Sequence, residues 1–390
     1  MAERGSARGN SATTMGTSID CSQALLESIT PAPSTSSVMI ATIRSLVTSV
    51  TVASPTPVHS RIEIVEGLRG LAALAVAWFH FTNANPAFPT LGWLRASGTY
   101  GWLGVESFFV ISGFIIPYAM LRAGYRVTDW RTFLAKRLLR LEPSYLVAIL
   151  VTLALWWVSS QSPTFTRQPP TATQVLLHVG YLPALFGYAW LDTAYWTLAV
   201  EFQYYLLMAV SFGWIAHPSA RIRCSCFAAA CLLPFAVPSD SLVCRYLGLF
   251  ALGIATFWRH SGFLTGGGYL GFLAAATVVT AATLGPAVAV VGAGTAVFIA
   301  YGARFRSRPL VWLGTVSYSL YLLHGPVGER VVNLGSRYAD APIAQVAVAF
   351  AAVAVSVGAA YGLYRFVEFP ALRAAASLRY KPRTVLTNAL

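Results

Sequence analysis

Long apolar segments follow one another along most of this chain, and such segments fold only where lipid or other helices cover them. Most are close to the roughly 20 residues that an α-helix needs to cross a bilayer, and a few are shorter. Charged residues make up only 11% of the chain, whereas a soluble domain carries about 25%. The sequence therefore predicts an all-α, polytopic membrane helix bundle with about ten transmembrane helices. The expected spans are 66–85, 101–121, 142–158, 195–214, 224–238, 243–258, 269–285, 286–303, 311–331 and 343–368.

The basic residues gather in alternate loops between these spans. The loops after the second, fourth, sixth and eighth spans are rich in cations, as is the C-terminal tail, while the opposite loops carry few. Lys and Arg accumulate on the cytoplasmic side of membrane proteins. We therefore predict that both termini are cytoplasmic and that ten spans close the topology. The net charge of +13 has the same explanation, so no nucleic-acid partner is expected.

Three regions of different composition divide the chain. Residues 1–60 are rich in Ser, Thr, Ala and Pro without a helical period, which predicts a disordered cytoplasmic tail. Residues 61–371 form the predicted transmembrane domain, and residues 372–390 form a basic cytoplasmic tail. The five cysteines lack the second pair that a zinc site of this spacing needs, so we expect free thiols and no metal site. They are Cys21, Cys224, Cys226, Cys231 and Cys244.

Several ionisable or polar residues interrupt the apolar segments, which is costly in lipid and usually serves a function. At about 1.5 Å per residue, His80, Glu201 and His324 fall at a comparable depth in the outer half of the membrane. Glu106 and Ser112 fall in or near the same layer. We therefore expect one polar layer that carries the chemistry. A purely structural hydrogen bond to a neighbouring helix is the alternative, above all for His324.

Two arginines of the segment LAKRLLRLEPSY lie at the cytoplasmic mouth of the third span. Arg137 and Arg140 are three residues apart and so share one helix face. They are either ordinary anchors on the positive side or a clamp for phosphates, whose geometry matches the guanidinium fork. The chain has no Walker sequence and no helix-opening GxGxxG motif. We therefore expect neither nucleoside triphosphate hydrolysis nor NAD binding. Gly113, in the second span, is interpreted as a contact between helices.

Six short motifs, taken in order, resemble those of the acyltransferase-3 family, ten-span membrane proteins that move acyl groups from acyl-CoA onto acceptors. They are Arg69-x10-His80 preceded by EGLRG, GVESFFVISGF at 104–114, Arg137-x-x-Arg140, Trp196-Thr-Leu-x-x-Glu201, Tyr318-x-x-Tyr321-Leu-x-His324 and Phe366-Val-Glu368-x-Pro370. The resemblance extends over about residues 61–371. Small departures are Glu66 and Glu106, where the family more often has Asp, and Glu142, where a hydrophobic or aromatic residue is common. Some relatives carry an extracytoplasmic SGNH-type hydrolase domain after the last span, which is not expected in a chain that ends at Leu390.

The resemblance implies a membrane O-acyltransferase, and more narrowly an O-acetyltransferase, in the inner membrane of a bacterium. Its acceptor would be a hydroxyl of a carbohydrate, a glycolipid or a glycosylated small molecule. Acyl-CoA would be the co-substrate, with no permanently bound cofactor. His80 would act as general base or acyl carrier, Glu201 would orient its imidazole, and three arginines would bind the acyl-CoA phosphates. These arginines are Arg69, Arg137 and Arg140, and the supporting polar residues are Glu106, Ser112, Trp196 and His324.

Other interpretations stay open. A proton-coupled transporter or exporter of an envelope precursor would use His80 and Glu201 as a proton relay, although no internal repeat relates the two halves of the chain. The tryptophans at the predicted outer face either mark the membrane interface or stack on a sugar ring. These are Trp93, Trp102, Trp190 and Trp196. The sequence does not distinguish direct transfer from a route through an acyl-enzyme. It also leaves open the identity of the acceptor, the acyl chain length and the oligomeric state.

Overall fold

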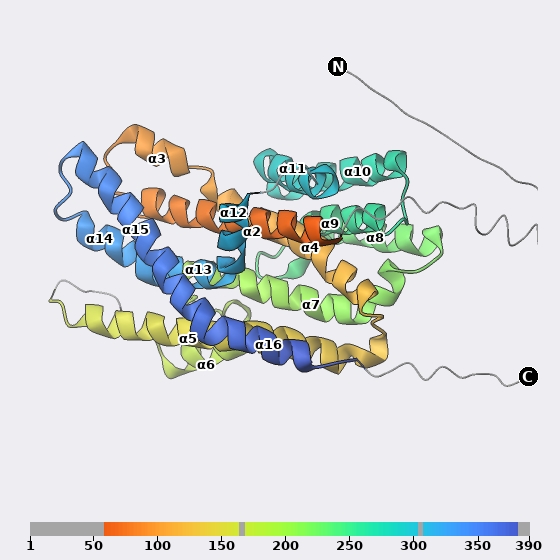
Figure 1. Cartoon of the computed structure of the whole chain (residues 1–390), viewed down its shortest axis with the longest axis horizontal. Helices are drawn as coiled ribbons and strands as arrows, with labels where there is room; N and C mark the ends of the chain where they lie inside the picture. The colour runs from red at the N-terminus through yellow and green to blue at the C-terminus, as the bar shows by residue number, and fades with distance from the viewer. Residues whose placement is uncertain (1–57, 164–167, 303–306, 381–390) are drawn as a thin grey trace, which may run out of the picture. The chain divides into compact units, whose positions relative to one another are not determined.

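The described parts of the chain are helical throughout, as the computed structural model in Figure 1 shows for residues 58–163, 168–302 and 307–380. The expected tail of residues 1–60 lies outside these residues, except that helix α2 already begins at Val58. At the other end, the last helix continues to Ser377, beyond the expected boundary at residue 371. Four cysteines lie in the described part, and all four are free thiols, as expected.

The α-helices have the following bounds: α2 Val58–Asn83, α3 Gly92–Gly98, α4 Gly104–Arg122, α5 Trp130–Ser160, α6 Ala172–Val179, α7 Trp196–Ile215, α8 Ala220–Ala236, α9 Leu247–His260, α10 Gly266–Leu284, α11 Pro286–Tyr301, α12 Arg308–Thr315, α13 Ser317–Leu323, α14 Glu329–Gly335, α15 Pro342–Leu363 and α16 Phe369–Ser377. Short 3₁₀ turns connect some of them: η1 Gly101–Leu103, η2 Val127–Asp129, η3 Pro183–Phe186, η4 Thr193–Tyr195 and η5 Val243–Tyr246. Two π-helical turns, η6 His324–Gly328 and η7 Tyr364–Glu368, lie within longer helical rods.

Six helical stretches in the described residues are long and apolar enough to cross a membrane. They are Glu63–Asn83, Gly92–Arg122, Val127–Ser160, Thr193–Ile215, Gly266–Leu284 and Pro342–Ser377. The chain is therefore a multi-pass integral membrane protein. Each of the ten expected spans falls on helical residues, but four of them coincide with shorter or interrupted helices. The count of ten and the side on which the termini lie stay predictions.

The four shorter spans differ from the expectation for separate reasons. Helices α8, α9 and α11 have 17, 14 and 16 residues, below the length that an untilted span requires. The expected span 311–331 is a broken rod of α12, α13, η6 and α14. Its π turn contains Pro326, which lacks the N–H that a regular α-helix needs. Apolar composition alone does not reveal such interruptions.

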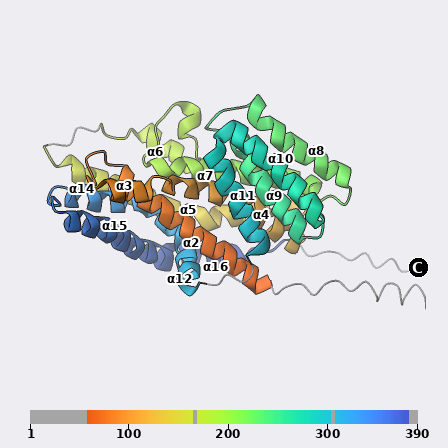
Figure 2. The same cartoon turned by 90° about the horizontal axis from the view of Figure 1, so that it is seen from above.

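Helix α2 lies between two groups of helices (Figures 1 and 2). On one side it packs against α4, which is followed by α9 and α11, with α10 and α8 beyond. On the other side it contacts α12, α13 and α15, and this second group reaches α5 through α16. Helix α7 contacts both α4 and α5 and so links the two groups. The space enclosed by α2, α4, α5, α7 and α13 holds the site described next.

The pair α4 and α9 approaches so closely that glycine is required on both helices. A Cβ atom on Gly113 would overlap the carbonyl oxygen of Phe250, and one on Gly253 would overlap that of Val110. Small residues that let two backbones approach are typical of helix contacts within membranes. The interpretation of Gly113 as a helix-packing residue is therefore confirmed.

Candidate active site

A partly open cavity of about 220 Å³ lies between α2, α4, α5, α7 and α13, and we call it the arginine cavity. Its walls are mainly apolar, but polar and charged side chains line it from five helices. These side chains are Glu66 and Arg69 from α2, Ser112 from α4, Arg137 and Arg140 from α5, Thr197, Glu201 and Tyr205 from α7, and Ser317, Tyr318 and Tyr321 from α13. A cavity with a few convergent polar groups in an apolar wall is the usual form of a small-molecule site.

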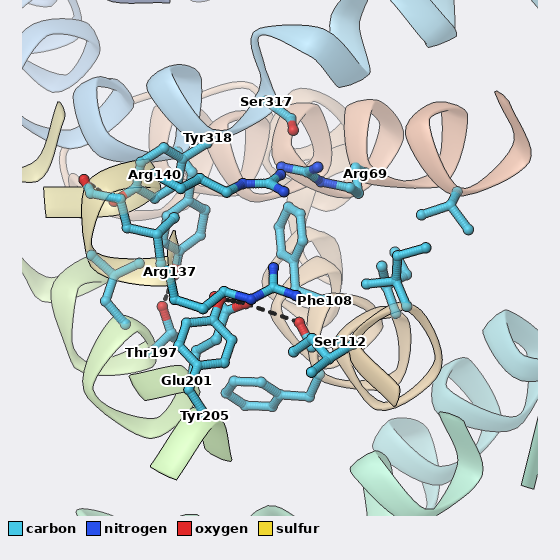
Figure 3. A pocket seen from close by; sticks show the side chains of 18 of the residues that line it. Arg69, Phe108, Ser112, Arg137, Arg140, Thr197, Glu201, Tyr205, Ser317 and Tyr318 are labelled. Carbon is cyan, nitrogen blue, oxygen red and sulfur yellow. Dashed lines mark hydrogen bonds between the residues drawn. The ribbon is translucent and has the colours of Figure 1, made fainter. Parts of the chain in front are cut away.

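The three arginines direct their guanidinium groups into this one cavity (Figure 3). Arg69 forms an ion pair with Glu66 at 3.5 Å. Neither Arg137 nor Arg140 forms an ion pair within the described residues. The guanidinium carbon of Arg137 lies 5.4 Å from the ring centres of Phe133 and Tyr205, which hold this side chain in place. The cavity therefore presents two guanidinium groups without a carboxylate partner, which is what an anionic ligand requires.

Glu201 is held on the α7 wall of the same cavity. Its Oε1 atom accepts hydrogen bonds from Ser112 Oγ at 3.0 Å and from Tyr205 Oη at 2.5 Å (Figure 3). These donors come from α4 and from the next turn of α7, so the carboxylate ties two helices together. The structure thus brings together five of the predicted site residues: Arg69, Ser112, Arg137, Arg140 and Glu201.

The two histidines form a second centre. The rings of His80 and His324 meet edge to face, with their centres 4.8 Å apart. His80 Nδ1 lies 2.7 Å from Glu329 Oε1. Because a carboxylate only accepts hydrogen bonds, Nδ1 is the donor and Nε2 is left as the basic nitrogen of a neutral ring. His324 donates from Nδ1 to the carbonyl of Tyr321 at 2.7 Å, and its buried Nε2 has no hydrogen-bond partner in the described residues.

The carboxylate that meets His80 is therefore not the predicted one. Glu201 was expected to orient the imidazole, whereas the structure places Glu329 there and binds Glu201 to Ser112 and Tyr205. The contact joins residues 249 positions apart, which no local pattern reveals. A signal was nevertheless present, because Glu329 falls within the expected ninth span, where a carboxylate needs a partner.

Asp192 is a second residue that sequence reasoning missed. It immediately precedes the span Thr193–Ile215, and its Oδ1 atom accepts a hydrogen bond from the backbone of Ala194 at 2.9 Å. A Cβ atom on Gly325 would overlap its Oδ2 atom, so the carboxyl group lies against the turn that follows His324. Burial raises the pKa of Asp192 to about 6, with a further rise caused by the charge of Glu329.

Aromatic and hydroxyl side chains connect the arginine cavity with the histidine pair. Tyr321 lines the cavity, and its ring centre is 5.6 Å from that of His324. Its hydroxyl group lies 2.8 Å from Thr197 Oγ1, so its position is fixed. Arg69 and His80 are 11 positions apart on α2, which is three turns and about 16 Å, so both point to one side of the helix. The arginine cavity and the histidine pair thus lie on the same side of α2, three turns apart.

The remaining predicted residues lie outside both centres. Glu106 is buried, and its Oε2 atom has no hydrogen-bond partner in the described residues. The ring of Trp196 packs edge to face on Phe109, with centres 6.1 Å apart. The expected single polar layer is therefore divided into the cavity group, the histidine group and an isolated carboxyl group.

The sequence matches the acyltransferase-3 family model, described as an acyltransferase domain, over residues 62–365. The O-acetyltransferase OatA of Staphylococcus aureus is 25% identical over 385 residues, which covers 78% of this chain and 56% of the relative. The Komagataeibacter xylinus protein BcsY, whose name describes a membrane-bound transacylase, is 28% identical over 312 residues, covering 69% of this chain and 73% of the relative. The peptidoglycan O-acetyltransferase OatA of Listeria monocytogenes is 24% identical, covering 78% of this chain and 55% of the relative.

This chain thus spans little more than half the length of the OatA relatives. No solved structure matches it. The family model, in contrast, covers most of the chain, including both centres and the helices that position them. The chain belongs to the acyltransferase-3 family.

Proposed function

We propose that this chain is a membrane O-acetyltransferase that moves an acetyl group from acetyl-CoA to a hydroxyl group of a carbohydrate. The observation that carries the proposal is the pairing of two centres. One is a cavity with guanidinium groups that have no carboxylate partner among the described residues, and the other is a histidine–glutamate pair three turns further along α2. Membership of an acyltransferase family supports the reaction class. The printed name of the Listeria relative, a peptidoglycan O-acetyltransferase, supports a carbohydrate acceptor.

The arginine cavity is the proposed binding site for the acyl-CoA phosphates. Arg137 and Arg140 are free of carboxylate partners in the described residues, and Arg69 faces them from α2. Planar guanidinium groups bind phosphate oxygens in pairs, and such hydrogen bonds are among the strongest in proteins. The flexible pantetheine arm then extends past Tyr321 and carries the thioester to the histidines. In the proposed topology the donor enters from the cytoplasmic side of a bacterial inner membrane, and the acceptor is bound at the opposite side.

His80 is the proposed general base. The Nδ1–H group donates to Glu329, so Nε2 accepts the proton of the acceptor hydroxyl group. The hydroxyl oxygen attacks the thioester carbonyl carbon, the C–S bond breaks, and CoA leaves as a thiolate that takes up a proton. Glu329 stabilises the imidazolium ring that forms in this step. Transfer through an acyl-imidazole on His80 uses the same groups, with His80 as nucleophile and the acceptor attacking afterwards.

The test is transfer of radiolabelled acetyl groups from acetyl-CoA in membranes that contain the wild type, His80→Ala, Arg137→Ala/Arg140→Ala, or Arg131→Ala. Arg131 is a matched control, since it is exposed on the same helix α5 and lies outside the cavity. We expect label in envelope glycan with the wild type and with Arg131→Ala, and none with His80→Ala. The double variant should recover at higher acetyl-CoA. Its KM for acetyl-CoA should rise at least about tenfold, because each charged hydrogen bond contributes about 1.5–3 kcal/mol.

Two results would contradict the proposal in different ways. If the double variant has the same KM for acetyl-CoA as Arg131→Ala, the phosphates of acetyl-CoA do not bind in the arginine cavity. Absence of label from any acyl-CoA, combined with a proton-coupled solute flux that depends on His80, would instead identify a transporter.

A further inference from the structure

A second hollow lies on the opposite side of α7 from the arginine cavity. It has a volume of about 640 Å³, and we call it the aromatic groove. Its lining includes Tyr181, Trp190, Thr193, Trp196, Asp240 and Tyr246. Four aromatic rings, a hydroxyl group and a carboxylate thus share one groove of a size typical of ligand sites.

The rings of the groove are held in fixed positions by packing behind them. Trp190, which is partly exposed, stands perpendicular to the ring of His178 at 5.4 Å. The ring of Tyr181 is buried and stacked on both Tyr145 and Phe202, with centres 5.0 and 5.2 Å away. Trp196 and Tyr246 contact each other at 5.4 Å. Rigid aromatic faces of this kind bind a flat apolar surface without losing side-chain entropy.

Polar groups stand beside these rings. The Asp240 side chain is 80% exposed, and its Oδ1 atom is 2.5 Å from Arg245 Nε. Gln203 of α7 fixes the neighbouring backbone, because its amide donates to the carbonyl of Ser241 at 2.8 Å and its oxygen accepts from the N–H of Val243 at 2.9 Å. An exposed carboxylate next to aromatic faces matches a sugar, whose C–H faces are apolar and whose hydroxyl groups donate hydrogen bonds.

The groove is adjacent to the arginine cavity. Thr197 and Glu201 of α7 line the arginine cavity, whereas Trp196 and Ala199 of the same helix line the groove. Phe109 belongs to the cavity wall and contacts the rings of Trp196 and Tyr246, at 6.1 and 5.2 Å. One aromatic layer therefore separates the two spaces.

A wall residue of the groove is next in sequence to a residue that contacts the turn carrying His324. Thr193 lines the groove, and the preceding residue, Asp192, lies against Gly325 beside His324. The Thr193 end of the groove is therefore the end from which a bound sugar would reach towards the histidines.

We propose that the aromatic groove binds the saccharide acceptor, with its sugar rings on Trp190 and Trp196 and its hydroxyl groups on Asp240. The inference rests on the proposed function in that the bound sugar is the acceptor of the acetyl group. The four tryptophans considered from the sequence divide accordingly. Trp190 and Trp196 line the groove, whereas Trp93 and Trp102, which are 63% and 37% exposed, line neither hollow.

Equilibrium binding of fluorescently labelled chitotriose, cellotriose and maltotriose to the detergent-solubilised full chain, without acetyl-CoA, tests this site. The variants are Trp190→Ala, Trp190→Phe, Asp240→Asn and the matched control Trp93→Ala. We expect the wild type to bind at least one trisaccharide. Trp190→Ala should weaken that binding at least about tenfold, as for other central aromatic contacts, while Trp190→Phe and Trp93→Ala stay within about threefold. Asp240→Asn should weaken it less, since an amide still forms hydrogen bonds.

The outcomes separate this inference from the proposed function. Wild-type protein that binds none of the three sugars, or Trp190→Ala that binds like Trp93→Ala, overturns the groove as a saccharide site. Equal losses in Trp190→Ala and Trp93→Ala overturn it as well, because both would then act as membrane-interface anchors. Acetyl transfer is measured on the same preparations. Sugar binding that depends on Trp190 without any acetyl transfer supports the groove and contradicts the transferase.

Discussion

Glu329 takes the place beside His80 that was expected for Glu201. Its carboxylate holds Nδ1 of His80 and would stabilise the charge that develops on the ring during proton transfer. We predict that Glu329→Gln lowers kcat for acetyl transfer about 10- to 100-fold, as is usual for groups that orient a working histidine. The KM for acetyl-CoA should stay unchanged, because Glu329 is not part of the arginine cavity.

The control for this prediction is Asp340→Asn, which removes a nearby exposed carboxylate. Steady-state kinetics of acetyl transfer in membranes with both variants decide the question. If Glu329→Gln keeps the wild-type kcat, or raises the KM for acetyl-CoA as the arginine variants do, Glu329 does not act through His80.

Asp192 gives a prediction about pH. Burial raises the pKa of its carboxyl group to about 6 in the folded chain, above its value of 3.8 in the unfolded chain. The folded state therefore binds a proton more tightly, so the stabilising effect is full below the unfolded pKa and is lost as the pH rises through 6. Asp192→Asn, which stays neutral, should melt at a higher temperature than the wild type at pH 7.5. This difference should shrink towards pH 4.5.

Thermal unfolding of the purified protein in detergent at pH 4.5, 6 and 7.5 measures this difference. Asp240→Asn is the control, since Asp240 is exposed and ion-paired with Arg245. A difference between Asp192→Asn and the wild type that stays constant over this range would mean that the carboxyl group does not titrate there.

At this scale the sequence predicted more of the arginine cavity than of the surroundings of the histidines. Arg69, Ser112, Arg137, Arg140 and Glu201 all stand in motifs that could be recognised in the sequence, and the structure brings them to one cavity. The partner of His80 and the contact between the two histidine rings follow from the tertiary packing of α2 on α13 and on η6. That packing brings Glu329 and Asp192 close to the histidines. Neither residue belongs to a sequence motif from which this contact could be predicted.

At the scale of helices, the contact between α4 and α9 depends on two glycines. Gly253→Val would place a side chain against the carbonyl oxygen of Val110 and the backbone N of Phe114, and backbone atoms cannot move aside. We predict a loss of at least about 1–3 kcal/mol in stability, the usual cost of overpacking a core. Gly213→Ala on α7 is the control, because a Cβ there would meet no atom within 4 Å.

Size-exclusion chromatography after heating, with detection of the folded fraction, compares these two variants. Gly253→Val should lose its folded peak at a lower temperature than the wild type. Gly213→Ala should match or exceed the wild type, since alanine favours helix over glycine by up to about 1 kcal/mol. Equal melting of Gly253→Val and the wild type would show that α4 and α9 do not pack this closely.

Helix positions were predictable because apolar segments in a membrane have few alternatives to helix. The ends of the helices and the interruptions within them could not be predicted in this way. The expected third span began at residue 142, whereas α5 begins at Trp130 and carries Arg137 and Arg140 within its own length. The polar start of α5 resembles a loop by composition, and it is helical because α16 and α7 pack against this helix.

At the scale of the whole molecule, helix length and loop charge give two different numbers of membrane crossings. Six helical stretches in the described residues are long enough, whereas the loop charges predict ten spans. The two alternatives differ at α8, α9, α11 and the rod formed by α12, α13, η6 and α14. With 17 residues, α8 is about 26 Å long, slightly shorter than a hydrocarbon core of about 30 Å, and local thinning of the bilayer accommodates such a difference at small cost.

The ten-span topology makes a prediction that six spans cannot share. Pro238 lies between α8 and η5, and Arg221 lies in the first turn of α8; both are exposed. In a variant without the native cysteines, Pro238→Cys should react with a membrane-impermeant maleimide in intact spheroplasts. Arg221→Cys should react only after the membrane is permeabilised, because α8 separates the two positions. If both positions react only after permeabilisation, α8 does not cross.

This measurement also bears on the aromatic groove. Asp240 lies two residues after Pro238, so the side on which Pro238 is labelled is the side from which a saccharide reaches the groove. The acceptor of an envelope acetyltransferase is outside the cytoplasm, and the arginine cavity opens among the residues predicted to face inside. Labelling of Pro238 from outside would therefore support the proposed arrangement, in which the donor and acceptor sites lie on opposite faces of α7 and only the acetyl group has to cross.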